Sequence, residues 1–475
     1  MKDSRSFSSI HTSLKQGSIS CQEIVQYYLR NIQEQKHLNV FLDVYADYAL
    51  ESAKNIDEKI SQGTAGRLAG MVIGLKDVLC LQDFPLQAGS KILDNFYTQF
   101  TSTAIQRLLD EDAIIIGRQN CDEFAMGSSN ENSAFGPTKN AADTTRVPGG
   151  SSGASAVSVQ ANLCTAALGS DTGGSVRQPA AFCGVVGLKP TYSRISRYGL
   201  LAYASSFDTI GIFTNNIEDN ALLLEIIAGQ DDYDSTASQQ PVVPYTKHLK
   251  FEKRAKVAYI SETLDNDGLN PEIKQRTEQA IQFLGDEGHE VEAVHFPMLK
   301  YLLPTYYILT MAEASSNLSR YDGVKYGYRT PDAQNLEAMY KKSRSEAFGE
   351  EVQRRIMLGT FVLSASYYDA YYTKAQKVRR LLRDATLQIL EDYDFIILPT
   401  TPTTAFRIGE TSSPLEMYLA DLFTVQASIA GVPAISIPNG TDSEGLPIGL
   451  QLMGSSFKEA DLFAFSSYLL EKFAQ

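Results

Sequence analysis

Two glycine- and serine-rich clusters lie close together in the first half of this 475-residue chain, and apolar residues border both. The first cluster is Gly149-Gly150-Ser151-Ser152-Gly153 and the second is Gly169-Ser170-Asp171-Thr172-Gly173-Gly174-Ser175. Glycine lets the backbone adopt positive φ angles and lets N–H groups approach a ligand closely. We therefore expect the two clusters to bring serine hydroxyls and exposed backbone amides to one place, where the chain can do chemistry.

A lysine precedes these clusters and offers a base for a serine nucleophile. Lys76 follows the apolar run 71–75 and lies 75 positions before Ser151 (151 − 76). A lysine can act as a base only where burial and its neighbours favour the neutral amine. A solvated surface lysine is the alternative. Its place directly after an apolar run favours the end of a strand that opens on a pocket.

The lysine motif and the two clusters together resemble the amidase signature family. The motifs are Gly-Leu-Lys-Asp at 74–77, Pro-Gly-Gly-Ser-Ser-Gly at 148–153 and Gly-Ser-Asp-Thr-Gly-Gly-Ser-Val-Arg-Gln-Pro at 169–179. The resemblance implies a Ser-Ser-Lys triad in which Ser175 attacks an amide, Ser151 on a cis peptide relays the proton and Lys76 is the base. The oxyanion hole would then be formed by backbone N–H groups of the turn that holds Thr172, Gly173, Gly174 and Ser175.

Other interpretations of the clusters are weaker. Residues 149–153 also fit the Gly-x-Ser-x-Gly turn of α/β-hydrolases, which requires an acid and a histidine downstream in that order. No downstream histidine has a suggestive context, and that interpretation leaves the second cluster and Lys76 without a role. An ordinary flexible loop does not explain why three separated motifs agree. Asp171 and Arg177 either pair to hold the second turn or form a surface ion pair.

Composition narrows the function classes further. Lysine and arginine total 42 against 56 acidic residues, a net charge of −14, which argues against this chain alone gripping a phosphate backbone. Five histidines show no HxxxH pattern and five cysteines no CxxC pair, so we expect no metal site and reduced, structural cysteines. The amino terminus lacks an apolar signal core, and no stretch near 18 uninterrupted apolar residues follows. These features predict a cytoplasmic protein without a membrane segment.

The apolar pattern predicts an α/β fold. Helical spacing over 19–32 and 45–60 indicates two N-terminal helices within about residues 1–65. Short apolar runs then alternate with helical patterns, which predicts a central, largely parallel mixed sheet with helices on both faces. The expected strands are Met71–Leu75, Ala113–Ile116, Val257–Ile260, Val291–Phe296, Phe395–Leu398, Ala434–Ile437 and Ile448–Met453.

Two further segments complete the expected organisation. Residues 154–168 are small and apolar, which predicts a buried helix that runs out of the first serine cluster. Residues from about 297 to 390 carry long helical patterns rich in tyrosine, which we interpret as a helical insertion. Since no low-complexity linker separates the parts, we predict a single domain of the amidase-signature fold over residues 1–475.

The resemblance extends over almost the whole chain and is strongest to the family of A subunits of bacterial glutamyl-tRNA(Gln) amidotransferases. It implies a glutaminase that passes ammonia through a channel to a B subunit, which uses ATP and Mg to amidate Glu-tRNA(Gln), while a small C subunit clamps the two. This chain would hold no cofactor, and tRNA would be bound mainly by the B subunit. The motifs are residues 122–131, 177–181, 187–192, 354–361 and 367–372.

The same resemblance implies the glutamine pocket. Arg355 would meet the α-carboxylate and Asp421 the α-ammonium group, while Tyr306 and the backbone from Met126 to Ser128 would line the pocket. Arg354 is the alternative carboxylate contact, because adjacent side chains on a helix point about 100° apart and at most one faces the pocket. The flanking residues favour Arg355.

A stand-alone amidase that acts on small neutral amides is the alternative function, and a catalytically silent scaffold is a third. The intact triad residues argue against silence. The sequence leaves open the channel route, the choice between Glu-tRNA(Gln) and Asp-tRNA(Asn), and how far activity depends on partners.

Overall fold

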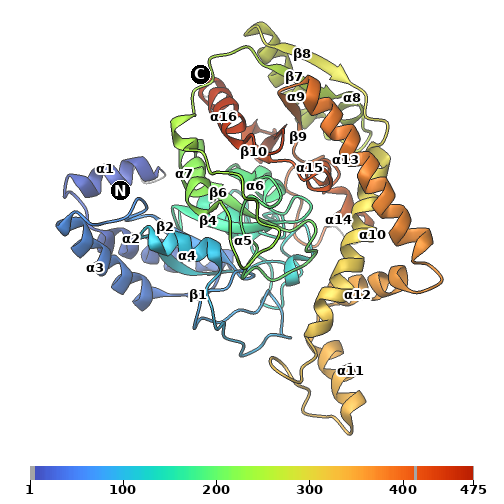
Figure 1. The fold of residues 1–475 in the computed structure, drawn as a ribbon. Helices are drawn as coiled ribbons and strands as arrows, with labels where there is room; N and C mark the ends of the chain where they lie inside the picture. The colour runs from blue at the N-terminus through green and yellow to red at the C-terminus, as the bar shows by residue number, and fades with distance from the viewer. Residues whose placement is uncertain (1–5, 411–413, 474–475) are drawn as a thin grey trace.

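A single mixed sheet runs through the computed structural model, which describes residues 6–410 and 414–473 (Figure 1). Its eleven strands are arranged in the order β1-β3-β2-β4-β6-β5-β10-β11-β9-β7-β8. The strands are β1 (Phe41–Val44), β2 (Val72–Lys76), β3 (Ile114–Gln119), β4 (Ala166–Asp171), β5 (Val186–Lys189), β6 (Thr209–Thr214), β7 (Lys256–Ile260), β8 (Glu290–Val294), β9 (Phe395–Pro399), β10 (Ala434–Thr441) and β11 (Pro447–Gly454).

The α/β class and the mixed sheet are confirmed, but the expectation of a largely parallel sheet is wrong. Among the described strands, six neighbouring pairs are antiparallel and four are parallel. The parallel pairs join β2 to β3 and β4, and β7 to β8 and β9. The apolar runs reflect burial on both faces, and β5 and β6, whose neighbours are all antiparallel, are as buried as β2, whose neighbours are parallel.

Helices flank this sheet. The α5 helix packs on β2, β4 and β6, α6 on β5, β10 and β11, and α7 and α16 on strands of the same central region. The helices are α1 (Phe7–Lys15), α2 (Cys21–Glu34), α3 (Ala46–Gln62), α4 (Thr103–Asp110), α5 (Gly153–Gln160), α6 (Arg177–Cys183), α7 (Ile217–Ile227), α8 (Ser261–Leu264), α9 (Pro271–Asp286), α10 (Leu299–Asn317), α11 (Leu336–Ala347), α12 (Glu350–Leu363), α13 (Lys374–Asp392), α14 (Pro414–Leu419), α15 (Val425–Ala430) and α16 (Glu459–Phe473).

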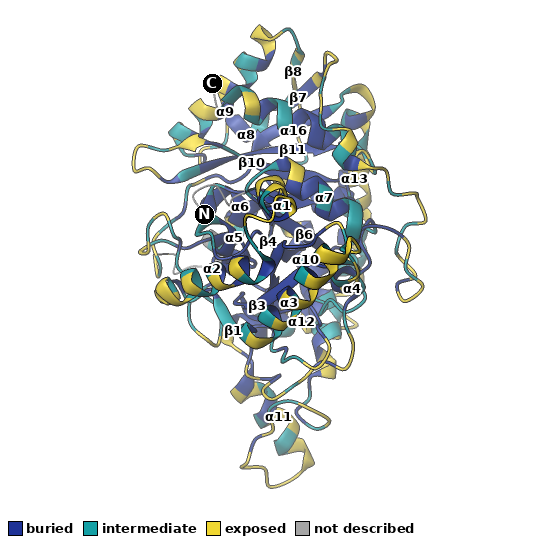
Figure 2. Ribbon diagram, turned by 90° about the vertical axis from the view of Figure 1, so that its left-hand side faces the viewer, coloured by how far each residue is buried: buried dark blue, intermediate teal, exposed yellow. Residues whose placement is uncertain are grey.

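The N-terminal helices and the tyrosine-rich segment are helical, as the spacing predicts. Ser20 and Glu23 form a reciprocal capping box that starts α2, and Gly63 with φ 70° ends α3. Helices α10, α12 and α13 lie side by side, on the other side of the molecule from α2 and α3 (Figure 1). Figure 2 shows the buried residues gathered along the sheet, with many exposed residues on α11.

The predicted helix over 154–168 is only half right. Helix α5 ends at Gln160, and the chain then turns at Asn162, whose φ is 56°, before β4 begins at Ala166. Asparagine tolerates this left-handed conformation and commonly follows a helix end. After this turn the chain enters the sheet as β4. The second serine cluster begins within β4 and continues beyond the carboxyl end of that strand.

Candidate active site

The sheet places Lys76 beside the second cluster. Lys76 is the last residue of β2, and β4 runs parallel to β2 with Leu75 opposite Leu168. The carboxyl ends of parallel neighbours meet at one edge of a sheet, where ligand sites commonly form. Lys76 therefore lies next to Ser170 and Asp171 at the end of β4, and it is completely buried.

Three hydroxyl groups surround the Lys76 amine. Its Nζ lies 2.7 Å from Oγ of Ser151, 2.9 Å from Oγ of Ser152 and 2.9 Å from Oγ of Ser170. Burial lowers the pKa of Lys76 to about 8, although nearby acidic groups act in the opposite direction. A substantial neutral fraction near neutral pH is what a general base needs.

The two serine clusters meet at the nucleophile. The Gly150–Ser151 peptide bond is cis, as the resemblance implies. The N–H of Ser152 donates to the carbonyl oxygen of Ser175 at 3.3 Å, which places the candidate nucleophile directly beside Ser151. Ser175 is partly exposed whereas Ser151 and Lys76 are buried, so a substrate entering from solvent would reach Ser175 first.

Asp171 and Arg177 form a buried pair that holds the second turn, which settles the two interpretations of these residues. Both side chains are completely buried, and the Arg177 guanidinium donates to both Asp171 oxygens at 3.0 and 2.9 Å. The same carboxylate accepts the N–H of Gly174 at 2.9 Å and that of Val176 at 3.2 Å. Burial acts to raise the pKa of Asp171, but the Arg177 charge holds it below its usual value.

This arrangement corrects one predicted oxyanion donor. The N–H of Gly174 is engaged by Asp171 and is therefore not available to an oxyanion, contrary to the prediction. Within the described residues, the N–H groups of Thr172, Gly173 and Ser175 have no hydrogen-bond acceptor. These three remain as candidate donors to developing negative charge.

The glycines of the turn allow close approach. A Cβ atom on Gly173 would lie 2.4 Å from the Tyr306 hydroxyl, and one on Gly174, whose φ is 139°, would lie 2.2 Å from Oγ1 of Thr424. Tyr306 is buried, and its hydroxyl forms no hydrogen bond to any described residue. The candidate pocket residue Tyr306 thus borders the candidate oxyanion turn directly.

Hydrogen bonds hold two of the three guanidinium nitrogens of Arg355. Its Nε donates to Oε1 of Glu351 at 2.8 Å and its Nη1 donates to the Tyr203 hydroxyl at 2.9 Å. Its guanidinium also lies over the rings of Tyr203, Tyr307 and Tyr418, at 5.7, 5.6 and 5.4 Å. The remaining Nη2 is buried and has no hydrogen-bond partner among the residues that the structure describes. A buried donor without an acceptor costs free energy, and a bound anion would supply the acceptor.

Arg354 points elsewhere. Its side chain is 34% exposed and pairs with Glu350 and Glu351 on the surface of α12. The neighbouring Arg355 side chain is only 3% exposed. The structure thus brings Arg355, and not Arg354, to the aromatic pocket.

Asp421 is the second charged residue of the candidate glutamine site. Its Oδ2 accepts hydrogen bonds from the Ser128 hydroxyl at 3.0 Å and from the Tyr307 hydroxyl at 2.8 Å. Burial raises the pKa of Asp421 to about 7, while these two hydrogen bonds act in the opposite direction. Tyr307 therefore touches both the Asp421 carboxylate and the Arg355 guanidinium and connects these two charged groups.

The segment 126–128 is tied to the catalytic turns by Gln178. The Gln178 side chain donates to the Ser128 carbonyl at 2.7 Å and accepts the N–H of Gly150 at 2.9 Å. Met126 is fully buried at the start of this segment. One side chain therefore connects the candidate pocket backbone to the turn that carries Ser151.

Sequence reasoning did not single out several residues that complete the site. Glu351 stands four residues before Arg355, a spacing that signals a helical ion pair. Ser152 and Ser170 belong to the clusters, yet their contact with Lys76 depends on the fold. No pattern in the sequence indicates that Tyr203 and Tyr418 frame Arg355.

The described residues contain neither a cluster of metal-ligating side chains nor a helix that could span a membrane. No group of three or more His, Cys, Asp or Glu side chains in ranges 6–410 and 414–473 could hold a metal ion. In the same ranges, no helix has the length and apolar character needed to cross a bilayer. The five cysteines are buried and unpaired.

Comparison with known proteins decides the family. The sequence profile named Amidase matches residues 23–463. The A subunit of the glutamyl-tRNA(Gln) amidotransferase from Cyanothece sp. is 51% identical over 467 residues, with 98% of this chain and 96% of that protein covered. Its counterpart from Chlorobium phaeobacteroides is 49% identical, with 98% of both chains covered. This chain belongs to that family of A subunits, within the amidases.

Solved structures agree with this assignment. The chain is similar to the A subunit of the glutamyl-tRNA(Gln) amidotransferase from Thermotoga maritima, with a TM-score of 0.79, 39% identity, and 95% of this chain and 91% of that chain covered. It is also similar to a peptide amidase from Stenotrophomonas maltophilia, with a TM-score of 0.83, 28% identity, and coverage of 98% and 96%. The amidase-signature fold is thereby confirmed, and the family is one of enzymes.

Proposed function

We propose that this chain is the glutamine-hydrolysing A subunit of a glutamyl-tRNA(Gln) amidotransferase. The observation that carries the proposal is the free Nη2 of buried Arg355, which Tyr307 connects to Asp421, and we take these two residues as the ends of the glutamine pocket. Free glutamine has an α-carboxylate and an α-ammonium group, and these two charges match the two ends of that pocket. A general amidase for small neutral amides has no use for such a pair.

In the proposed reaction, the Ser175 hydroxyl attacks the side-chain amide carbonyl of glutamine. Its proton passes through the Ser151 hydroxyl to neutral Lys76, which lies 2.7 Å from Ser151. The N–H groups of Thr172, Gly173 and Ser175 bind the tetrahedral oxyanion, and one such donor is typically worth about 3 to 4 kcal/mol of barrier.

Collapse of this intermediate breaks the carbon–nitrogen bond. The proton returns from Lys76 through Ser151 to the leaving nitrogen, which departs as ammonia, and a glutamyl ester remains on Ser175. Water then attacks the ester with the same base, which releases glutamate and restores the Ser175 hydroxyl.

The substrate contacts follow from the pocket. Arg355 binds the α-carboxylate through Nη2, Asp421 binds the α-ammonium group, and Tyr306 with the backbone from Met126 to Ser128 lines the space between. A bound ammonium group would favour the charged form of Asp421, whose pKa burial raises to about 7.

The remaining assignments extend the same proposal. The chain works in the cytoplasm as one member of a heterotrimer with B and C subunits. Ammonia passes to the B subunit, which binds ATP, Mg and most of the tRNA surface and converts Glu-tRNA(Gln) to Gln-tRNA(Gln). The net charge of −14 supports this division, because such a chain is poorly suited to grip tRNA along its length.

A Ser175→Ala variant in the complex purified with its native partners tests the proposal. We expect loss of glutamine-dependent amidation of Glu-tRNA(Gln), while amidation with added ammonium persists, because only glutamine cleavage uses Ser175. Loss of both activities in an assembled complex would refute the separation of the two sites. Robust hydrolysis of simple amides by the isolated chain, without preference for glutamine, would instead favour a stand-alone amidase.

A further inference from the structure

Helix α13 borders a cavity that none of the candidate catalytic residues lines. The cavity, which we call the α13 cavity, has a volume of about 710 Å³. Its charged lining comes from Arg379, Arg380, Arg383 and Asp384 on α13. The opposite wall includes Thr191, Tyr192 and Ser193, which come shortly after β5 in the chain and carry hydroxyl groups.

The positive charge of this cavity is largely uncompensated. Three arginines face one carboxylate, and Asp384 engages only Arg380, at 3.5 Å. Neither Arg379 nor Arg383 forms an ion pair with any residue that the structure describes. Two positive charges of the cavity are therefore not neutralised by a direct ion pair, although the Glu313 charge acts on Arg379.

Arg379 is fixed in place before any ligand arrives. Its guanidinium lies 3.8 Å from the ring centre of Phe207, and its Nη1 and Nη2 each donate to Ser206 at 2.8 Å. The nearby Glu313 carboxylate accepts the Ser206 N–H at 2.9 Å and the Ser206 hydroxyl proton instead of forming an ion pair with Arg379. Burial lowers the pKa of Arg379, and the charge of Arg383 acts in the same direction.

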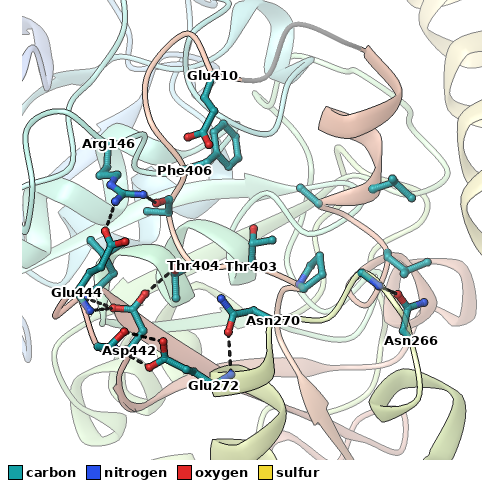
Figure 3. A pocket seen from close by; sticks show the side chains of 18 residues that line it. Arg146, Asn266, Asn270, Glu272, Thr403, Thr404, Phe406, Glu410, Asp442 and Glu444 are labelled. Carbon is teal, nitrogen blue, oxygen red and sulfur yellow. Dashed lines mark hydrogen bonds and ion pairs between the residues drawn. The ribbon is translucent and has the colours of Figure 1, made fainter.

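A second cavity of similar size provides a contrast. The cavity in Figure 3 has a volume of about 720 Å³ and carries Arg146 against Glu272, Glu410, Asp442 and Glu444. Its single arginine pairs with Glu444, and its other carboxylates accept hydrogen bonds from neighbouring protein groups. The charged groups of that cavity have partners within the protein, whereas in the α13 cavity Arg383 has no hydrogen bond or ion pair with any residue that the structure describes.

We propose that the α13 cavity binds a phosphate group, carried either by a small nucleotide-sized molecule or by an RNA backbone. Guanidinium groups match phosphate oxygens with two parallel hydrogen bonds, and serine, threonine and tyrosine hydroxyls commonly supply further donors. The volume lies within the range of about 300 to 1,000 Å³ that is typical of small-molecule sites. Arg380 and Arg383 contact the phosphate, and Arg379 adds a fixed positive charge.

Isothermal titration calorimetry on the full chain at low ionic strength tests this site. The probes are inorganic pyrophosphate, AMP, a short oligouridylate and adenosine as the uncharged comparator. Pyrophosphate should bind once per chain. The Kd should rise about tenfold or more in Arg383→Ala, as expected when a charge-assisted hydrogen bond is lost, and less in Arg383→Lys.

Lys377→Ala is the matched control, because Lys377 is an exposed cation on the same helix that does not line the cavity. Its Kd for pyrophosphate should equal that of the wild type. Displacement of pyrophosphate by AMP alone would identify a small phosphate as the ligand, and displacement by oligouridylate would identify an RNA backbone; either result supports the site. Thermal melting of each variant excludes misfolding, and Arg380→Ala provides a second test if Arg383→Ala does not fold.

Four results would overturn the proposal. The first is no pyrophosphate binding, and the second is an equal loss in Lys377→Ala, which would indicate only a diffuse surface charge. The third is loss of binding in Arg355→Ala, which would place the anion in the glutamine pocket. The fourth is adenosine binding as tightly as AMP, because the phosphate would then contribute nothing.

Discussion

Replacement of Arg355 by alanine should separate substrate binding from the catalytic machinery. In the structure this side chain is 3% exposed, and its Nη2 is the buried donor without a partner. A charge-assisted hydrogen bond to the glutamine carboxylate is worth about 1.5 to 3 kcal/mol, which corresponds to roughly 10- to 150-fold in KM. The fold should survive, because Glu351 keeps Arg354 and the Tyr418 hydroxyl as partners.

Arg354→Ala is the natural control for this experiment. It removes the same charge one position earlier, but its exposed pairs with Glu350 and Glu351 are worth about 1 kcal/mol or less. We therefore expect less than about a fivefold change in KM for glutamine. Arg355→Lys should be intermediate, because it keeps the charge and loses the planar fork.

The assay is steady-state glutamate formation by the assembled complex, with a small amide that lacks the amino-acid head as a second substrate. Arg355→Ala should hydrolyse that amide about as well as wild type, since Lys76, Ser151 and Ser175 are untouched. An unchanged KM for glutamine in Arg355→Ala would refute the carboxylate contact. A larger defect in Arg354→Ala would move the contact by one residue.

Three further predictions concern the catalytic centre. Because the pKa of Lys76 is about 8, its neutral fraction rises from about a tenth at pH 7 to about nine tenths at pH 9, so kcat/KM for a small amide that lacks the amino-acid head should rise almost tenfold between these pH values, and a flat profile would exclude Lys76 as the base. Ser151→Ala should lower kcat by about 100-fold or more and Ser152→Ala far less, although both hydroxyls contact Lys76; equal kcat values would leave the relay unassigned. Asp171→Asn should destabilise the protein by about 3 to 5 kcal/mol in urea denaturation, because it leaves the buried Arg177 charge unpaired, and a change below about 1 kcal/mol would contradict that role.

Local apolar runs predict the positions of β2 and β9 accurately. The runs at 71–75 and 395–398 correspond to β2 and β9 with a shift of one residue or less at each end. Strand direction was not predictable in the same way, because an apolar run records burial on both faces and carries no information about the neighbouring strand. The short turn between β10 and β11 makes that pair antiparallel, although most residues of both strands are buried.

The sequence analysis missed β1, β4, β5 and β6. Strand β6 reads Thr-Ile-Gly-Ile-Phe-Thr and carries an ordinary strand signal, but β4 and β5 do not. Strand β4 reads Ala-Ala-Leu-Gly-Ser-Asp and β5 reads Val-Gly-Leu-Lys, with few of the β-branched and aromatic residues that signal a strand. Close packing explains this choice: a Cβ on Gly169 would lie 2.8 Å from Phe213 and from Oγ of Ser152. Residues that must approach the catalytic hydroxyls are small for that reason, and they lose their strand signal as a result.

The candidate triad could be named from motifs, whereas its electrostatic setting could not. Lys76, Ser151 and Ser175 each sit in a recognisable cluster, and the fold brings the first two within hydrogen-bond distance. The framing of Arg355 by Tyr203 and Tyr418 depends on residues that are 152 and 63 positions away in sequence (355 − 203 and 418 − 355). No local pattern encodes contacts of that range.

The buried pair of Asp171 and Arg177 resolves a conflict that the chemistry imposes on this site. Asp171 is needed to hold the amides on both sides of Ser175, but its negative charge also acts to raise the pKa of Lys76. Arg177 opposes that charge at 2.9 Å and is itself held by the Thr424 carbonyl and the Gln451 side chain, each at 2.6 Å. Arg177 therefore helps to hold the turn in place, and burial keeps the pKa of Lys76 low, as a base requires, although the Asp171 charge acts to raise it.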